Sequence, residues 1–128
     1  MAPKMLLSRE NTNVNLIVAW RRGAIRVGEQ WLQGHTIVSP ETIISDWAVD
    51  SPESLQVEHL EPAIAMQPEV LLLGTGARLV LPVANLMQLL GERGIGLEIM
   101  DTPAACRTYN VLAHEHRRAV AALFEPGD

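Results

Sequence analysis

The pattern of apolar and polar positions is clearest between residues 70 and 101. Two short apolar runs, 70–73 and 97–100, flank a segment in which apolar residues recur at helical spacing. A strand, a helix and a second strand in this order predict a βαβ unit with two parallel strands. Parallel strands end at the same edge of a sheet. We therefore expect residues 74–76, which follow the first strand, to face Asp101 and Thr102, which follow the second.

The helix of this unit is predicted to hold Pro82 in its first turn, where proline is tolerated. Gly91 and Gly94 supply its end. The helix presents a wide apolar face. The residues expected on that face are Val83, Leu86, Met87, Leu89 and Leu90.

The first forty residues alternate short apolar runs with glycines, which predicts an antiparallel meander. Its strands are expected at 16–20, 24–27, 30–32 and 35–38, after a loose lead-in over residues 1–12. Ser39-Pro40 closes the meander, because proline breaks ladder pairing. Residues 43–49, which include Trp47, are expected to pack on it, and a short helix is expected at about 58–66.

The end of the chain gives one clear element and one ambiguous element. Thr102-Pro103 is typical of a helix start, with a capping hydroxyl followed by proline, and the helix is expected to run to about residue 115. Residues 118–124 either extend this helix or form a final strand. An apolar run this short cannot be assigned by periodicity.

The strand ends supply the candidate ligand-binding site. A helix starting at Pro103 brings several polar residues into one neighbourhood with the glycines. Gly74-Thr75-Gly76 resembles the opening of a dinucleotide fingerprint, but Leu79 stands where a third glycine is expected, so a tight strand exit is the favoured explanation. The candidate crevice comprises Gly74, Thr75, Gly76, Asp101, Thr102, Cys106, Arg107 and Asn110.

Cys106 has two interpretations. A thiol near a helix N-terminus and an arginine can have a lowered pKa and act as a nucleophile. A lone cysteine is more often a small buried hydrophobe, and no histidine has forced proximity to act as its base. His114 and His116 would point about 200° apart on a helix, so we expect no metal site. No cofactor is indicated.

Composition narrows the function class. The chain has 128 residues, which suits a single domain over 1–128. Its net charge of −5 argues against a nucleic-acid-binding surface, and Arg117-Arg118 is interpreted as solvated surface. One cysteine excludes an intrachain disulfide. No apolar stretch is long and uninterrupted enough to span a membrane, and there is no secretory signal, so we expect a cytoplasmic protein.

Three segments together resemble a small α/β family. They are residues 68–76, residues 94–102, and residues 104–112 followed by Arg117. The family includes the mitochondrial complex I assembly factor 3, an adipogenesis-associated protein of the same domain type, and uncharacterised bacterial and archaeal proteins. The resemblance implies an α/β fold in three layers: a central mixed five-stranded sheet, helices on both sides, and an additional antiparallel β layer from the N-terminal half.

The resemblance also implies that residues 118–124 form the last strand, antiparallel to its neighbours. Many members have glycine where this chain has His116, a residue that tolerates a left-handed backbone better than most. The family brings no catalytic residues. It implies a non-catalytic binding or assembly protein with a protein partner, such as a peripheral-arm subunit of complex I.

A small-ligand-binding protein or enzyme that uses the candidate crevice is the alternative. A third interpretation is that the polar residues near Asp101 only cap helices and tie the sheet edge together. The sequence leaves the oligomeric state open.

Overall fold

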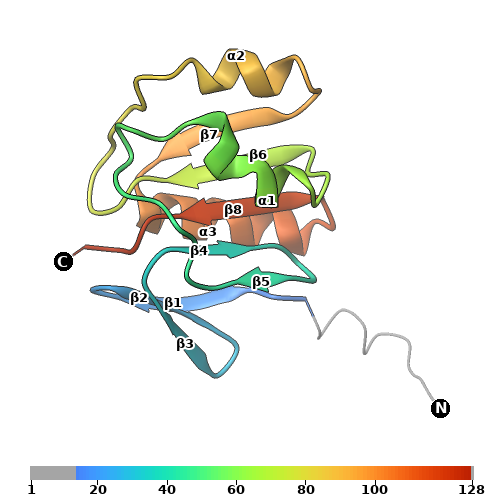
Figure 1. The fold of residues 1–128 in the computed structure, drawn as a ribbon. Helices are drawn as coiled ribbons and strands as arrows, with labels where there is room; N and C mark the ends of the chain where they lie inside the picture. The colour runs from blue at the N-terminus through green and yellow to red at the C-terminus, as the bar shows by residue number, and fades with distance from the viewer. Residues whose placement is uncertain (1–13, 128) are drawn as a thin grey trace.

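A mixed five-stranded sheet forms the centre of the computed structural model, which describes residues 14–127 (Figure 1). Its strand order is β5-β4-β8-β6-β7. The strands are β4 (Thr36–Val38), β5 (Ile43–Ile44), β6 (Val70–Gly74), β7 (Gly96–Met100) and β8 (Ala119–Leu123). β6 pairs in parallel with both β7 and β8, whereas β4 pairs antiparallel with β5 and β8. The βαβ prediction is confirmed; the expected lead-in over residues 1–12 lies outside the described residues.

A second, antiparallel sheet contains β1 (Ile17–Arg21), β2 (Ala24–Val27) and β3 (Gln30–Gln33). The predicted meander is correct for these three strands and wrong for the fourth, because β4 crosses to the central sheet and pairs with β8. All three residues of β4 are buried, so this strand needs cover on both faces. Residues 43–44 pair with β4 in the central sheet, and Ile43 also packs, as expected, against the cluster that contains Ile17 and Ile25 of the meander.

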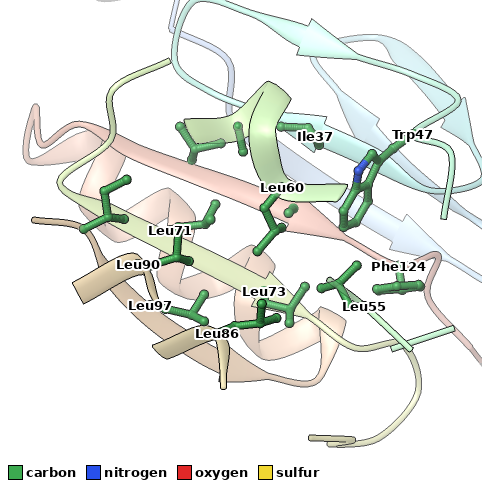
Figure 2. Close-up of a cluster of buried hydrophobic side chains, with 14 residues drawn as sticks. Ile37, Trp47, Leu55, Leu60, Leu71, Leu73, Leu86, Leu90, Leu97 and Phe124 are labelled. Atoms are coloured by element: carbon green, nitrogen blue, oxygen red, sulfur yellow. The ribbon is translucent and has the colours of Figure 1, made fainter. Parts of the chain in front are cut away.

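Helices lie on both faces of the central sheet. The 3₁₀-helix η2 (Val57–Leu60) runs into α1 (Glu61–Ile64), and α2 (Leu86–Gly91) lies on the same face (Figures 1 and 2). The long helix α3 (Thr102–His114) lies on the other face, where the three-stranded sheet also packs. The predicted short helix at 58–66 is confirmed, and the whole arrangement agrees with the α/β class that the resemblance implies.

The sheet carries an apolar core on each face because its central strands are apolar at every position. Leu71 and Leu73 point into the core under η2 and α1, and Leu72 points into the core under α3. Figure 2 shows the first core, where Trp47 lies against Phe124 with ring centroids 5.3 Å apart. The Trp47 Nε1–H donates to the His59 carbonyl at 2.8 Å, so the indole is buried with its polar atom satisfied.

The expected apolar face of α2 is correct for Leu86 and Leu90 and wrong for Val83, Met87 and Leu89. The helix begins at Leu86, after Asn85, and Pro82 lies in the preceding loop. In so short a helix only two positions four residues apart, Leu86 and Leu90, reach the core. Val83, expected to be inward, has 88% of its surface exposed.

The ambiguous segment before the C-terminus is a strand, β8, as the resemblance implies. Its expected antiparallel direction is correct against β4 and wrong against β6, beside which it runs parallel. The reason is topological: α3 reverses the chain between β7 and β8, so both strands point the same way. The turn into β8 places His116 at φ 63°, which confirms that a histidine can take the left-handed conformation there.

Candidate functional site

The structure brings the ends of β6 and β7 together, as predicted from the βαβ pattern. The Thr75 N–H donates to the Met100 carbonyl at 2.9 Å, and the Thr102 N–H donates to the Gly76 carbonyl at 2.9 Å. The two segments are therefore hydrogen-bonded to one another directly at the place where a crevice was expected.

Thr102 joins three segments of chain at this edge. Its hydroxyl donates to the Phe124 carbonyl at 2.7 Å and accepts from the Gly76 N–H at 2.8 Å, and the residue is fully buried. The expectation that Thr102 caps α3 is wrong. Asp101 does so, because its carboxylate accepts from the Ala104 N–H at 2.8 Å. Thr102 thus binds the sheet edge together.

The glycines at this edge serve close packing and chain reversal. A Cβ on Gly74 would lie 2.9 Å from both the Leu123 side chain and the Thr102 hydroxyl oxygen, and Gly76 has φ +99°. The Thr75 hydroxyl donates to the Arg78 carbonyl at 2.7 Å and accepts from the Val80 N–H at 3.1 Å. These contacts support the tight strand exit and occupy polar groups that a ligand would need. Ligand binding at this edge stays a prediction.

Cys106 is a buried hydrophobe. Only 3% of its surface is exposed, and it packs in the core beneath α3 with Ala105 and Tyr109. Burial raises the pKa of the thiol to about 12, against a smaller opposing effect of the Arg107 charge. The interpretation of Cys106 as a low-pKa nucleophile is therefore wrong, because desolvation outweighs the positive charge.

We expect native Cys106 to react with a disulfide reagent such as DTNB at pH 8 about a thousandfold more slowly than the unfolded chain, since the thiolate is the reactive form. The raised pKa has a second consequence. Between pH 9 and 12 the unfolded thiol ionises while the folded thiol does not, so stability falls as the pH rises through that window. Labelling of the native protein at the unfolded rate would contradict this picture.

Asn110 holds the three-stranded sheet against α3. Its Oδ1 accepts from the Ile17 N–H at 2.9 Å, and its Nδ2 donates to the Ile17 carbonyl at 2.7 Å. The preceding residue, Tyr109, donates from its hydroxyl to the Asn15 carbonyl at 2.7 Å, and burial raises the pKa of that phenol. The Asn110 side chain is therefore engaged by β1 and not by the strand ends with which it was grouped.

Replacing Asn110 with aspartate should lower the free energy of unfolding by about 2 kcal/mol, because a carboxylate cannot donate to the Ile17 carbonyl. Urea unfolding followed by circular dichroism measures the loss. Asn85→Asp is the matched control, since Asn85 is exposed and its side chain donates to the Gln88 side chain at the surface. Equal stability of the two variants would show that the hydrogen bonds of Asn110 to Ile17 do not hold the three-stranded sheet against α3.

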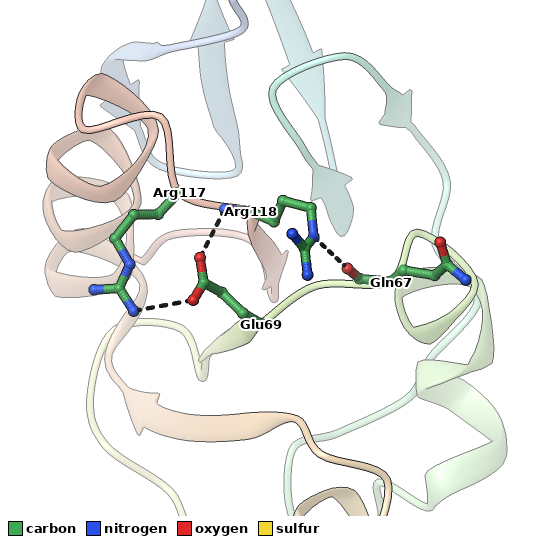
Figure 3. Close-up of polar contacts among 4 residues, drawn as sticks. All are labelled: Gln67, Glu69, Arg117 and Arg118. Carbon is green, nitrogen blue, oxygen red and sulfur yellow. Dashed lines mark hydrogen bonds and ion pairs between the residues drawn. The ribbon is translucent and has the colours of Figure 1, made fainter.

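The sequence did not reveal a polar edge at the opposite end of the sheet, where β6 and β8 begin (Figure 3). Glu69 accepts from an Arg117 guanidinium nitrogen at 3.5 Å and from the Arg118 backbone N–H at 3.3 Å, and both contacts lower the pKa of its carboxyl. Arg118 Nε donates to the Gln67 carbonyl at 3.0 Å. Two hollows of about 510 and 570 Å³ share Arg118 and Pro68 in their walls.

The sequence contained a signal for this edge, because the residues that directly precede two paired parallel strands lie at the same edge of the sheet. It was missed because the pairing of β6 with β8 spans about fifty residues and no local pattern indicates it. Elsewhere in residues 14–127, no three potential metal-ligating side chains lie close enough together to hold an ion. No helix in that range is long and apolar enough to cross a bilayer.

Large apolar side chains are exposed along the loop before α2 and on α2 itself. We call this set of residues the α2 surface. Its exposed fractions run from 41% to 88%, and the sequence has no charged residue from position 79 to position 91. Singly exposed apolar residues are ordinary, but several within one short stretch of chain indicate an interaction surface. The α2 surface comprises Leu79, Leu81, Val83, Met87 and Leu89.

Comparison with known proteins adds relatives of three kinds. The zebrafish (Danio rerio) NADH dehydrogenase [ubiquinone] 1 alpha subcomplex assembly factor 3 is 41% identical over 101 residues, which cover 74% of this chain and 58% of the zebrafish protein. The 13 kDa major membrane protein of Francisella tularensis is 29% identical, covering 75% of this chain and 77% of that protein.

A crystal structure of a Bordetella parapertussis protein superposes with a TM-score of 0.80 at 37% identity, covering 88% of this chain and 96% of that one. The chain spans less than two thirds of the length of the zebrafish and human assembly factors that it matches. Residues 17–124 match the family described as "Protein of unknown function (DUF498/DUF598)". The chain therefore belongs to the DUF498/DUF598 family.

Proposed function

We propose that this chain is a non-catalytic binding protein that assists the assembly of respiratory complex I by holding a peripheral-arm subunit at the α2 surface. The observation that carries the proposal is the exposure of the five apolar side chains of that surface. The assembly-factor relatives support the choice of partner.

The chemistry of the α2 surface suits a protein partner. Interface cores are depleted in charged residues, and residues 79–91 contain none in a chain whose net charge is −5. Met87 adds a flexible, polarizable side chain that adapts to a partner's shape. The surface also lies on an ordered support, because Leu86 and Leu90 fix α2 to the core.

The alternative function, a small-ligand site or active site at the ends of β6 and β7, has no comparable support. The hydroxyls of Thr75 and Thr102 are bonded to backbone groups of the chain itself. Cys106 lacks the lowered pKa that a nucleophile needs.

The test is affinity purification of the tagged protein from its native host in mild detergent, with mass spectrometry of the proteins that co-elute. A variant carrying Leu81→Ser, Val83→Ser and Met87→Ser removes exposed apolar groups without touching the core. Val18→Ser with Val111→Ser is the matched control, because both are exposed apolar residues outside the α2 surface.

We expect peripheral-arm subunits of complex I to be enriched with the wild type and the control variant, and lost with the α2-surface variant. Thermal unfolding checks that all three proteins are folded. A prey list without these subunits would refute the assembly proposal, and equal capture by all three proteins would refute the α2 surface as its site.

A further inference from the structure

The hollow of about 570 Å³ between the end of α1, the turn after α2 and the start of β8 has the chemistry of an anion site. We propose that it binds a small oxyanion, a carboxylate or phosphate group, with Arg118 as its main ligand. This inference is independent of the α2 surface and of the proposed function.

The wall of the hollow combines two arginines and other polar groups with apolar side chains. Arg93 follows α2 and Arg118 precedes β8, and Gln67 and Gly94 are the other polar residues of the wall. None of the described residues that line it is acidic. Its volume lies within the range of sites that hold small ligands, roughly 300–1,000 Å³.

The arginines at this edge differ in their partners. Arg93 pairs with Glu61 through two contacts of 3.0 and 3.3 Å, and Arg117 pairs with Glu69 at 3.5 Å. Arg118 has no carboxylate partner among the described residues; its Nε donates to the Gln67 carbonyl. Its two terminal nitrogens make no contact with the other residues drawn in Figure 3. Among the described residues, Arg118 is thus the arginine of this edge that forms no ion pair, although its charge also acts on the Glu69 carboxylate nearby.

The backbone holds Arg118 in place for this role. Its N–H donates to the Glu69 carboxylate, and its carbonyl accepts from the Glu69 N–H at 2.9 Å. Gln67 has φ 57°, in the left-handed region, where its carbonyl accepts from the guanidinium. With Nε fixed, the terminal nitrogens form a planar fork that matches two oxygens of a carboxylate or phosphate. Little conformational entropy remains to be lost on binding.

The test is a titration of the isotope-labelled protein, followed by ¹H–¹⁵N correlation spectra, with inorganic phosphate in one series and succinate in another at constant ionic strength. We expect saturable shifts confined to the amides of residues 67–70, 93–95 and 117–119. Saturation by phosphate alone would assign a phosphate group, saturation by succinate alone a carboxylate, and saturation by both a general oxyanion site; each supports the proposal.

Arg118→Gln should weaken binding by roughly tenfold or more, since it removes a charge-assisted pair of hydrogen bonds. Arg78→Gln is the matched control, because it removes one exposed positive charge at the opposite end of β6 and should leave the affinity unchanged. Absence of saturable shifts with both anions would overturn the proposal. Equal weakening by the two variants would also overturn it, because binding would then reflect overall charge.

Discussion

Replacing Thr102 with valine is expected to lower the free energy of unfolding by about 4 kcal/mol, the largest single effect at the strand-end edge. Valine keeps the shape and the β-branch but removes the hydroxyl. The Phe124 carbonyl and the Gly76 N–H, both buried, then lose their partner at the same time. A buried group without a partner costs about 1–3 kcal/mol, and here there are two.

Thr102→Ser provides the control for that experiment. Serine retains the hydroxyl and loses one methyl group, so its cost should stay near 1 kcal/mol. Chemical denaturation of both variants and the wild type measures the difference. Valine and serine variants of equal stability would mean that the two hydrogen bonds of the Thr102 hydroxyl contribute nothing to stability. Thr102 would then not hold the three segments together at this edge.

Gly74→Ala is expected to lower the free energy of unfolding by about 3 kcal/mol, because the new methyl group has no room. It would lie 2.9 Å from the Leu123 side chain and 3.0 Å from the Thr102 Cα, and a backbone atom cannot move aside cheaply. Relief would require the end of β6 to separate from β8 or from the start of α3.

Gly91→Ala is the matched control for Gly74→Ala. A Cβ on Gly91 meets nothing within 4 Å, and this glycine lies in α2, so alanine should stabilise the protein by about 0.5–1 kcal/mol. The two substitutions thus have opposite expected signs. A neutral Gly74→Ala variant would show that β6, α3 and β8 do not approach as closely as described.

Local patterns were sufficient for the elements that local chemistry determines. The apolar run 70–73, the glycines after it and the Thr102-Pro103 helix start predicted β6, its tight exit and α3, and the structure confirms all three, with Asp101 in place of Thr102 as the cap. The parallel pairing of β6 with β7 followed from the helix between them. These features depend on neighbours within about thirty residues.

The errors concern features that depend on distant partners. Nothing near residues 36–38 indicates that β4 pairs with β8, some eighty residues later. Three residues of the α2 surface, Val83, Met87 and Leu89, were predicted to face the core, because periodicity cannot distinguish a core-facing side chain from an exposed apolar one.

In the candidate site, too, features set by nearby residues were predicted and features set by distant partners were not. The sequence correctly placed the glycines near Asp101 and Thr102, but it could not show that the Thr102 hydroxyl is bonded to Phe124, twenty-two residues away. It also could not assign Arg118, whose contacts with Gln67 and Glu69 exist only because β6 and β8 start at the same edge.

Site-specific photo-crosslinking in the native host would show whether the protein binds its partner through the α2 surface. A photoreactive residue would replace Val83, which is 88% exposed on that surface, or Val111, which is 57% exposed on α3. We expect the photoreactive residue at position 83 to crosslink to a complex I subunit and the one at position 111 not to do so. Crosslinking from position 111 alone, or from neither position, would contradict it.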